Sequence, residues 1–344
     1  MTEKEILEAV RACARGEEPK SDIGELLRAH RCYPLINRKE KEQTLMERVV
    51  NLAALKERYR ACAPFFQKAD FPYAVVKGAV LSAVAYGDSL LRVSGDVDIL
   101  IRRQDADAAK RLLQGCGFIQ GRVTDGGIVP FSRKEILYQT AVSHQTAPYV
   151  RKTESPICPY VNVDVNMDIL WGECERHSNM EAVLAEREPF RLFDVDFYKL
   201  QPEMEFVALC LHHYKDMNSL YLLSEGSLCL GLFCDIYFYI RNAKPSAARL
   251  VELCAKLDVG RFVYVCLAHT MEIFDEPLLL PYLEALEGMR DECLLDSFGL
   301  NDGERHTWDL SLTERVLCPD LPTHIWSLLS EKDREKIRIN RENM

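Results

Sequence analysis

The spacing of apolar residues changes twice along this chain of 344 residues, and no other feature limits the possible folds as strongly. Residues 1–66 carry apolar side chains at helical spacing, most clearly between Leu45 and Phe66. Residues 67–201 hold short β-rich runs separated by turns, and helical spacing returns after Pro202. We therefore expect an N-terminal helical arm (1–66), an α/β core (67–201) and a helical domain (202–344).

The same patterns predict individual elements within these segments. Four β-rich runs predict strands at 73–77, 97–101, 136–142 and 161–171. Helical spacing predicts helices at 79–86, 105–113, 203–217, 227–241, 247–257, 261–274 and 279–294. Ser178 and Glu181 have the spacing of a capping box ahead of a further short helix. The charged residues after Leu329 predict a mobile tail.

Charge and hydropathy exclude some partners. The 43 Lys and Arg against 53 Asp and Glu give a net charge of −10, which disfavours general nucleic-acid binding because that requires cations to replace phosphate counterions. The most apolar run, Leu228–Ile240, is too short to span a bilayer and contains Asp235. The charged start has no signal-peptide core. We expect a cytoplasmic protein with no membrane partner.

The 13 cysteines favour no metal site or disulfide framework. Their number is odd, their spacing is irregular and no C-x-x-C pair occurs. Several lie among apolar residues, where a free cysteine behaves as a small hydrophobic side chain. We therefore expect buried, reduced thiols at Cys62, Cys210, Cys229, Cys234, Cys254 and Cys266.

Two carboxylates, Asp96 and Asp98, stand two residues apart at the head of the predicted strand 97–101. Side chains alternate along a strand, so both project to the same side, a few ångströms apart. Two like charges at that distance are costly unless a cation neutralises them. Mg²⁺ typically binds one or two carboxylates together with substrate phosphates, so the pair predicts a site for Mg²⁺ or Mn²⁺.

A phosphate-binding element is expected beside this pair. Lys77 and Gly78 end one predicted strand and precede a helix, whose free backbone N–H groups attract anions. Gly78 allows a phosphate to approach the backbone closely, and Lys77 adds positive charge. The loop from Gly87 to Gly95 carries Arg92 and Ser94 toward the two acids. We expect Lys77, Gly78, Arg92 and Ser94 to bind a nucleoside triphosphate.

A third carboxylate is expected from a neighbouring strand. In the run 161–171, Asp164, Asn166 and Asp168 alternate and would share one face. A further acid there could complete a second metal site or act as the base for an attacking hydroxyl, as two-metal phosphoryl transfer requires.

The order Lys77-Gly78, Arg92 and Asp96-Val-Asp98 resembles the polymerase-β nucleotidyltransferase superfamily, and most closely its uncharacterised bacterial KG…R…D-x-D type. The resemblance spans roughly residues 40–280 and implies an α+β fold, in which a small mixed sheet is flanked by helices. It also implies that Asp96 and Asp98 bind the catalytic metals. The family's third acid lies in a D-x-H-W-like strand, which Asp168-Ile-Leu-Trp171 fits with Leu170 in place of His, so that Asp168 is favoured and Asp164 stays open.

The implied activity is transfer of a nucleoside monophosphate, AMP from ATP or another NTP, to a hydroxyl or phosphate acceptor with release of pyrophosphate. A small molecule, peptide or protein is favoured as acceptor over nucleic acid. Two alternatives stay open: a toxin-type enzyme that modifies RNA or protein, as in abortive-infection systems, and an inactive nucleotide-binding or scaffold module. All three acids are present, which counts against the inactive module.

Two other groups of potential metal ligands have simpler explanations. His212 and His213 lie in a long apolar predicted helix, where packed structural histidines are expected. The run from Glu173 to His177 contains acids, a cysteine and a histidine, but its composition is typical of a solvated turn.

Overall fold

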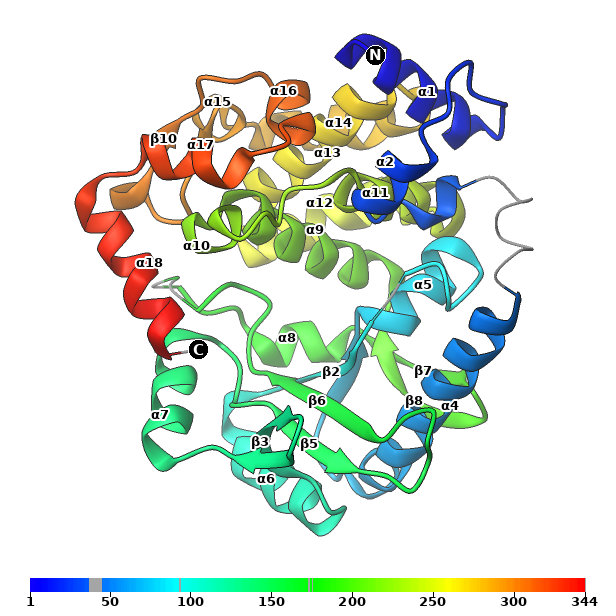
Figure 1. Cartoon of the computed structure of the whole chain (residues 1–344), viewed down its shortest axis with the longest axis vertical. Helices are drawn as coiled ribbons and strands as arrows, with labels where there is room; N and C mark the ends of the chain where they lie inside the picture. Colours follow the sequence, from blue (N-terminus) through cyan, green and yellow to red (C-terminus); the bar gives the residue numbers. More distant parts are fainter. Residues whose placement is uncertain (37–44, 93, 173, 175, 344) are drawn as a thin grey trace. The chain divides into compact units, whose positions relative to one another are not determined.

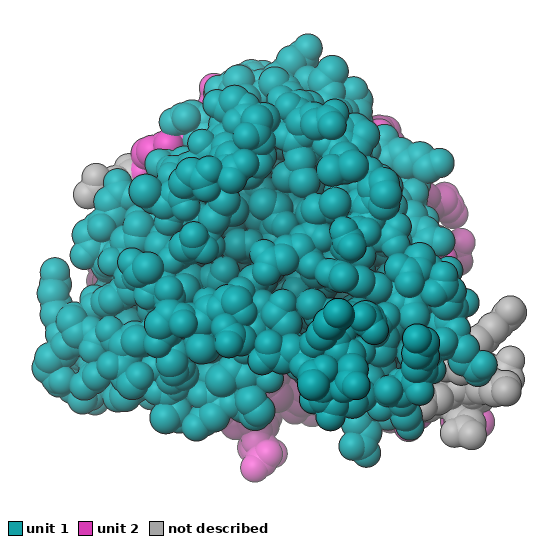
Figure 2. All heavy atoms as spheres, turned by 90° about the horizontal axis from the view of Figure 1, so that it is seen from above, with its two compact units in different colours: residues 1–43, 206–342 teal, residues 44–205, 343–344 magenta. Residues whose placement is uncertain are grey.

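The computed structural model describes the chain except for residues 37–44, 93, 173, 175 and 344, and divides it into two compact units. Unit 1 comprises residues 1–43 and 206–342, and unit 2 comprises residues 44–205 with the last two residues. Each unit is coloured separately in Figure 2. The predicted arm, 1–66, is thus shared between the units, because its second half lies in unit 2.

Unit 2 is built around a mixed eight-stranded sheet, drawn in blue to green in Figure 1. The strand order is β4-β3-β5-β6-β2-β1-β8-β7, in which β2–β6 and β1–β8 are parallel and the other pairs antiparallel. The strands are β1 (Tyr73–Val76), β2 (Asp96–Ile101), β3 (Ile119–Thr124), β4 (Gly127–Pro130), β5 (Tyr149–Lys152), β6 (Tyr160–Asn166), β7 (Arg187–Leu192) and β8 (Val195–Leu200). This mixed sheet with helices confirms the predicted α+β class.

One face of the sheet is apolar and packs against two helices, α4 (Leu45–Lys68) and α6 (Ala106–Gly115). The strands contribute alternate residues to this core, including Val97 and Ile99 from β2 and Val163 and Val165 from β6. Period-two alternation therefore places Asp96, Asp98 and Asp164 on the opposite face. The other helices of the unit are α5 (Gly78–Tyr86), α7 (Arg133–Val142) and α8 (Met180–Ala185), with a 3₁₀ turn η2 (Arg103–Asp105).

Most elements of the predicted core are confirmed, but the strand predicted at 136–142 is wrong. These residues belong to helix α7, which begins with a capping box between Ser132 and Glu135. Two hydrogen bonds satisfy backbone groups at the helix start, and they outweigh the β-rich composition of the run. Similarly, α8 is capped by Asn179 rather than Ser178, because the Asn179 side chain accepts a hydrogen bond from the Ala182 amide.

Strand β6 ends at Asn166, five residues earlier than predicted. The alternation that would have placed Asp168 beside Asp164 therefore stops before Asp168 is reached. This early end decides which acids meet in the site described below.

Unit 1 is mostly helical. Its N-terminal part contains α1 (Glu3–Arg15), α2 (Gly24–Ala29) and η1 (Tyr33–Leu35). Its C-terminal part contains most of α9 (Pro202–Asn218), then α10 (Leu220–Ser224), α11 (Leu230–Ala243), α12 (Ala247–Leu257), α13 (Gly260–Phe274), η3 (Pro277–Leu279), α14 (Leu280–Leu286), η4 (Glu287–Met289), α15 (Glu292–Leu295), β9 (Ser297–Phe298), η5 (Asp302–Glu304), β10 (His306–Thr307), α16 (Leu312–Leu317), α17 (Leu321–Leu328) and α18 (Glu331–Asn343). The helix predicted at 279–294 is thus broken into short turns.

Hydrogen bonds from arginine side chains to backbone carbonyls hold the two parts of unit 1 together. Arg11 donates from Nε to the Ile273 carbonyl at 2.8 Å, and Arg241 donates to the Ala14 carbonyl at 2.7 Å. These bonds link α1 with α13 and α11, which explains why the first residues group with the C-terminal helices. Within this unit, His213 Nε2 lies 3.1 Å from Asp235 Oδ2, and both residues are buried, as expected for a structural histidine.

The mobile tail predicted after Leu329 is wrong. Residues 331–343 form α18, in which Ile337 and Asp333 are buried, and Arg341 Nε donates to Glu225 Oε1 at 2.7 Å. The charged composition of this segment gave no sign of these tertiary contacts.

The cysteine prediction is confirmed, since all six cysteines named above are buried and every cysteine is a free thiol. Among the helices that the structure describes, none is both long and apolar enough to cross a bilayer.

The aromatic core beneath the sheet offers a test of the packing. Phe65 is fully buried, and its ring centroid lies 5.8 Å from that of Tyr73 and 5.9 Å from that of Phe66. We expect Phe65→Ala to lower the free energy of unfolding by about 3–5 kcal/mol, because it leaves a cavity that neighbouring rings cannot fill. Leu137→Ala, at a helical position that is 60% exposed, should change it by less than about 0.5 kcal/mol. Equal chemical-denaturation midpoints for the two variants would contradict the described core.

Candidate active site

The turn between β1 and α5 has an unusual backbone. Lys77, the residue before α5, has φ of 57° and ψ of −150°, and Gly78 has φ of 48°. A non-glycine residue in this region costs about 1–3 kcal/mol and persists only where the surrounding structure enforces it. The turn directs Lys77 Nζ to Asp98 Oδ1, 3.2 Å away, and the free N–H groups of α5 begin next to it.

Asp96 and Asp98 project from β2 on the same face, as predicted. Asp98 is 7% exposed, and its Oδ1 accepts hydrogen bonds from Lys77 Nζ and, at 3.0 Å, from Asn166 Nδ2. Asp96 Oδ1 accepts a hydrogen bond from Ser94 Oγ at 3.0 Å. Both carboxylates therefore have fixed orientations before any ligand binds.

Asp164 is the third acid at this place. In the parallel pair of β2 and β6, Asp98 and Asp164 are register partners, so their side chains lie on the same face of adjacent strands. Burial, and then the charges of Asp98 and Asp96, raises the pKa of Asp164 to about 7. Burial and the charge of Asp98 likewise raise the pKa of Asp96. Burial and the neighbouring carboxylates thus both disfavour the charged forms of Asp164 and Asp96.

Ser94 links the turn at Lys77 and Gly78 with the acids. Its Oγ contacts Asp96, and a β-carbon placed on Gly78 would lie 3.0 Å from that Oγ, so only glycine fits at position 78 without displacing Ser94. Arg58, from α4, donates a hydrogen bond to the Ser94 carbonyl. Arg92 lies in the same loop, where its backbone amide donates to Ser82 Oγ at 3.0 Å.

Asp168 has different neighbours. Its carboxylate accepts hydrogen bonds from the amides of Leu170 and Ser178 at 3.0 to 3.2 Å. Its Oδ2 lies 3.4 Å from His177 Nδ1 and 3.7 Å from His144 Nδ1. Every hydrogen bond and ion pair that the structure describes for Asp168 is to these residues, and none is to Asp96 or Asp98.

The sequence placed Asn166 on the face of Asp164 but did not indicate its role, and it gave no sign of Arg58. The Oδ1 of Asn166 accepts from Gln145 Nε2 at 2.6 Å, which orients its amide toward Asp98. The role of Arg58 could not be predicted, because the sequence of a helix does not indicate which of its arginines will bind the carbonyl of a distant loop.

The donor set suits a hard divalent cation. Three carboxylates on adjacent strands offer oxygen ligands, and Mg²⁺ or Mn²⁺ prefers these ligands. Lys77 and the start of α5 add the positive charge and the N–H groups that phosphate oxygens require. The site can therefore accept a phosphate-bearing substrate together with a cation.

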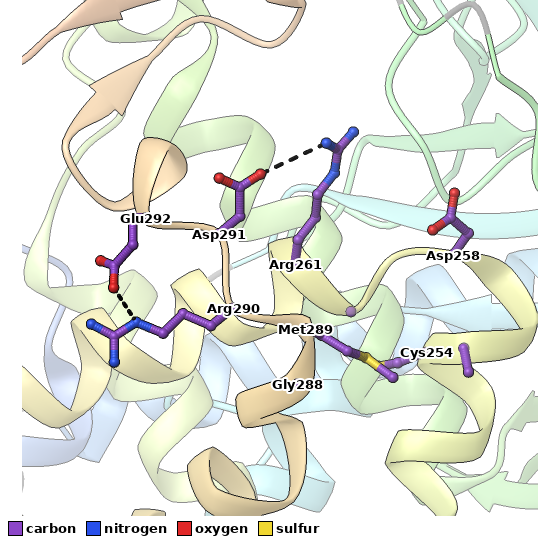
Figure 3. A pocket seen from close by; sticks show the side chains of 10 residues that line it. Cys254, Asp258, Arg261, Gly288, Met289, Arg290, Asp291 and Glu292 are labelled. Carbon is purple, nitrogen blue, oxygen red and sulfur yellow. Dashed lines mark ion pairs between the residues drawn. The ribbon is translucent and has the colours of Figure 1, made fainter.

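A separate cavity of about 510 Å³ lies in unit 1 and contains none of these residues. Figure 3 shows its charged lining, in which Arg261 pairs with Asp291 at 3.8 Å and Arg290 with Glu292 at 2.8 Å. These four charged residues of the cavity lining are thus paired with one another.

A mixed sheet with acids on adjacent strands, next to a lysine–glycine turn that begins a helix, defines a class of enzymes that transfer phosphate-linked groups. The chain belongs to the family described as "Uncharacterised nucleotidyltransferase", whose model matches residues 23–275. It is a nucleotidyltransferase.

The structural comparison adds a distant likeness. The crystal structure of an antigenic nucleotidyltransferase-like protein from Paracoccidioides brasiliensis is 15% identical, and the match covers 68% of this chain and 93% of that chain with a TM-score of 0.39. No curated protein matches the chain. The family assignment therefore rests on the family model alone.

Gly78, the first residue of α5, and Gly87, which follows its last residue, provide a matched test of the turn. Gly78→Ala should lower the free energy of unfolding by roughly 1–2 kcal/mol, because alanine disfavours the left-handed backbone conformation. It should also displace Ser94 from Asp96. Gly87→Ala has φ of 68° but open space around its β-carbon, so it carries only the backbone cost. We expect nucleotidyl transfer to fall on the order of 10²-fold in Gly78→Ala, as for a misplaced catalytic group, and to persist in Gly87→Ala. Equal activities, measured with labelled nucleotide, would show that the Ser94 contact is unimportant.

Proposed function

We propose that this protein transfers a nucleoside monophosphate, AMP from ATP, to a hydroxyl or phosphate acceptor and releases pyrophosphate. The observation that carries the proposal is the meeting of Asp96, Asp98 and Asp164 on one sheet face beside Lys77. The KG…R…D-x-D order in the sequence supports the same assignment. The main alternative is an inactive binding module. Such a module would not need three neighbouring carboxylates, whose burial and mutual repulsion are unfavourable.

Asp96, Asp98 and Asp164 would hold the cation. When bound, Mg²⁺ or Mn²⁺ would neutralise the triphosphate and polarise the phosphoryl group that is attacked. Burial first, and then the neighbouring carboxylate charges, raises the pKa of Asp164 and of Asp96, and a bound cation would offset both effects, which supports this assignment.

The residues of the turn would bind the triphosphate. The N–H groups at the start of α5 donate to phosphate oxygens, and Gly78 leaves room for their approach. Lys77 contributes positive charge. Because its ammonium group already contacts Asp98, it would interact with both that carboxylate and a phosphate. Ser94 fixes Asp96, and we propose that Arg92 reaches the phosphates from the same loop.

The acceptor would approach the sheet at Asp164. A carboxylate there can orient the attacking hydroxyl and accept its proton. The net charge of −10 favours a small molecule, peptide or protein acceptor over nucleic acid.

The paired acids can be tested directly. Asp96→Asn with Asp98→Asn should reduce transfer of label from α-labelled ATP by more than about 10³-fold, because ligands and charge are both lost. The fold should persist, since removing two repelling charges costs no packing. Asp125→Asn, in the exposed turn between β3 and β4, is the control and should retain activity. Continued label transfer by the double variant would contradict the proposed site.

A second pair of variants identifies the third acid. Asp164→Asn should lower the transfer rate by about 10²-fold or more, the contribution of a positioned base or metal ligand. Asp168→Asn should leave the rate near that of the unchanged protein, because the amide oxygen can still accept from the backbone. The reverse result, measured per folded molecule by circular dichroism and labelled ATP, would restore Asp168 as the third acid.

A further inference from the structure

A second group of potential metal ligands lies in unit 2, outside the acidic site. It consists of His144, which follows α7, Asp168, which follows β6, and His177, from the loop before α8. One ligand atom from each residue lies within 4.8 Å of the others. Three separate segments thus converge on one place.

The distances from Asp168 to the two histidines are longer than direct hydrogen bonds. Both imidazole Nδ1 atoms lie near the same oxygen, Asp168 Oδ2, at 3.4 Å for His177 and 3.7 Å for His144. An N–H···O hydrogen bond rarely exceeds about 3.2 Å. Two ligands bonded to tetrahedral zinc at about 2.0–2.1 Å lie roughly 3.3 Å apart. The ring centroids of His144 and His177 are 4.8 Å apart, and their planes are inclined by 42°.

The surroundings hold Asp168 in place, because the amides of Leu170 and Ser178 donate to its carboxylate. Such outer partners orient ligands in metal sites. The Leu170 carbonyl lies 3.1 Å from His144 Nδ1, and this hydrogen bond is given up when Nδ1 binds an ion. The Ser178 Oγ is buried and has no hydrogen-bond partner in the described structure. The His177 side chain is 60% exposed, which gives a path to solvent.

We propose that His144, Asp168 and His177 bind one zinc-class divalent ion, with solvent completing the coordination. Two imidazoles and one carboxylate form a nitrogen-rich set that favours zinc over magnesium. The ion replaces the proton and hydrogen bond of His144 Nδ1 and links the three segments. This site is separate from the acids Asp96, Asp98 and Asp164, and it does not depend on the transfer reaction.

The test uses the full-length protein after removal of bound metal with a chelator. Calorimetric titration with Zn²⁺, in excess Mg²⁺ to occupy the three-carboxylate site, should give one ion per chain, and His177→Ala should weaken binding by at least about tenfold. Because His177 is exposed, this variant should keep the fold. Co²⁺ substitution should give a visible spectrum without the charge-transfer band of a Co–thiolate bond, which separates the site from the cysteines.

His212→Ala is the matched control, because His212, His213 and Asp216 are the other group of this kind among the described residues. It should bind Zn²⁺ like the unchanged protein. The proposal is overturned if no ion binds, if His177→Ala binds as tightly as the unchanged protein, if His212→Ala loses the ion, or if Co²⁺ shows thiolate coordination.

Discussion

The parallel pairing of β2 with β6 is the interaction on which the rest of the site depends. Its register places Asp98 opposite Asp164, and alternation sends Val97, Ile99, Val163 and Val165 to the other face. The apolar face binds α4 and α6, and that burial opposes the repulsion of the acids. A shift of one residue would bury the carboxylates against Phe65 and expose the valines, so the core and the site fix the same register.

A small set of hydrogen bonds positions the charged side chains of the site. Lys77, Asn166 and Asp98 form one chain of contacts, and Gln145 extends it through Asn166. Ser94 connects the turn at Lys77 and Gly78 with Asp96, and Arg58 holds the Ser94 carbonyl from the core side of the unit. The acidic side chains on the strands are thereby positioned by residues from a helix and two loops.

Much of this could be predicted from sequence because the signals were local. The Asp96-Val-Asp98 pair, the Lys77-Gly78 turn and the strand at β2 each depend on neighbouring residues. Asp168 was favoured as third acid because Asp168-Ile-Leu-Trp171 resembles the family's D-x-H-W-like strand. The strand was also expected to continue to Trp171, but where β6 ends depends on its pairing with β5 and β2. The helix at α7 and the anchoring of α18 through Ile337 were missed for the same reason: composition does not record which capping or tertiary contacts prevail.

One oxygen of Asp98 accepts two hydrogen bonds, from Lys77 Nζ and Asn166 Nδ2, and both go to Oδ1. The carboxylate therefore offers Oδ2 as its open oxygen, so a cation at the proposed site would be held by Asp98 in a monodentate manner. Few protein ligands would then remain for an ion that prefers six oxygens. Water and phosphate oxygens must supply the others, and the cation and the nucleotide would consequently strengthen each other's binding by mutual thermodynamic linkage.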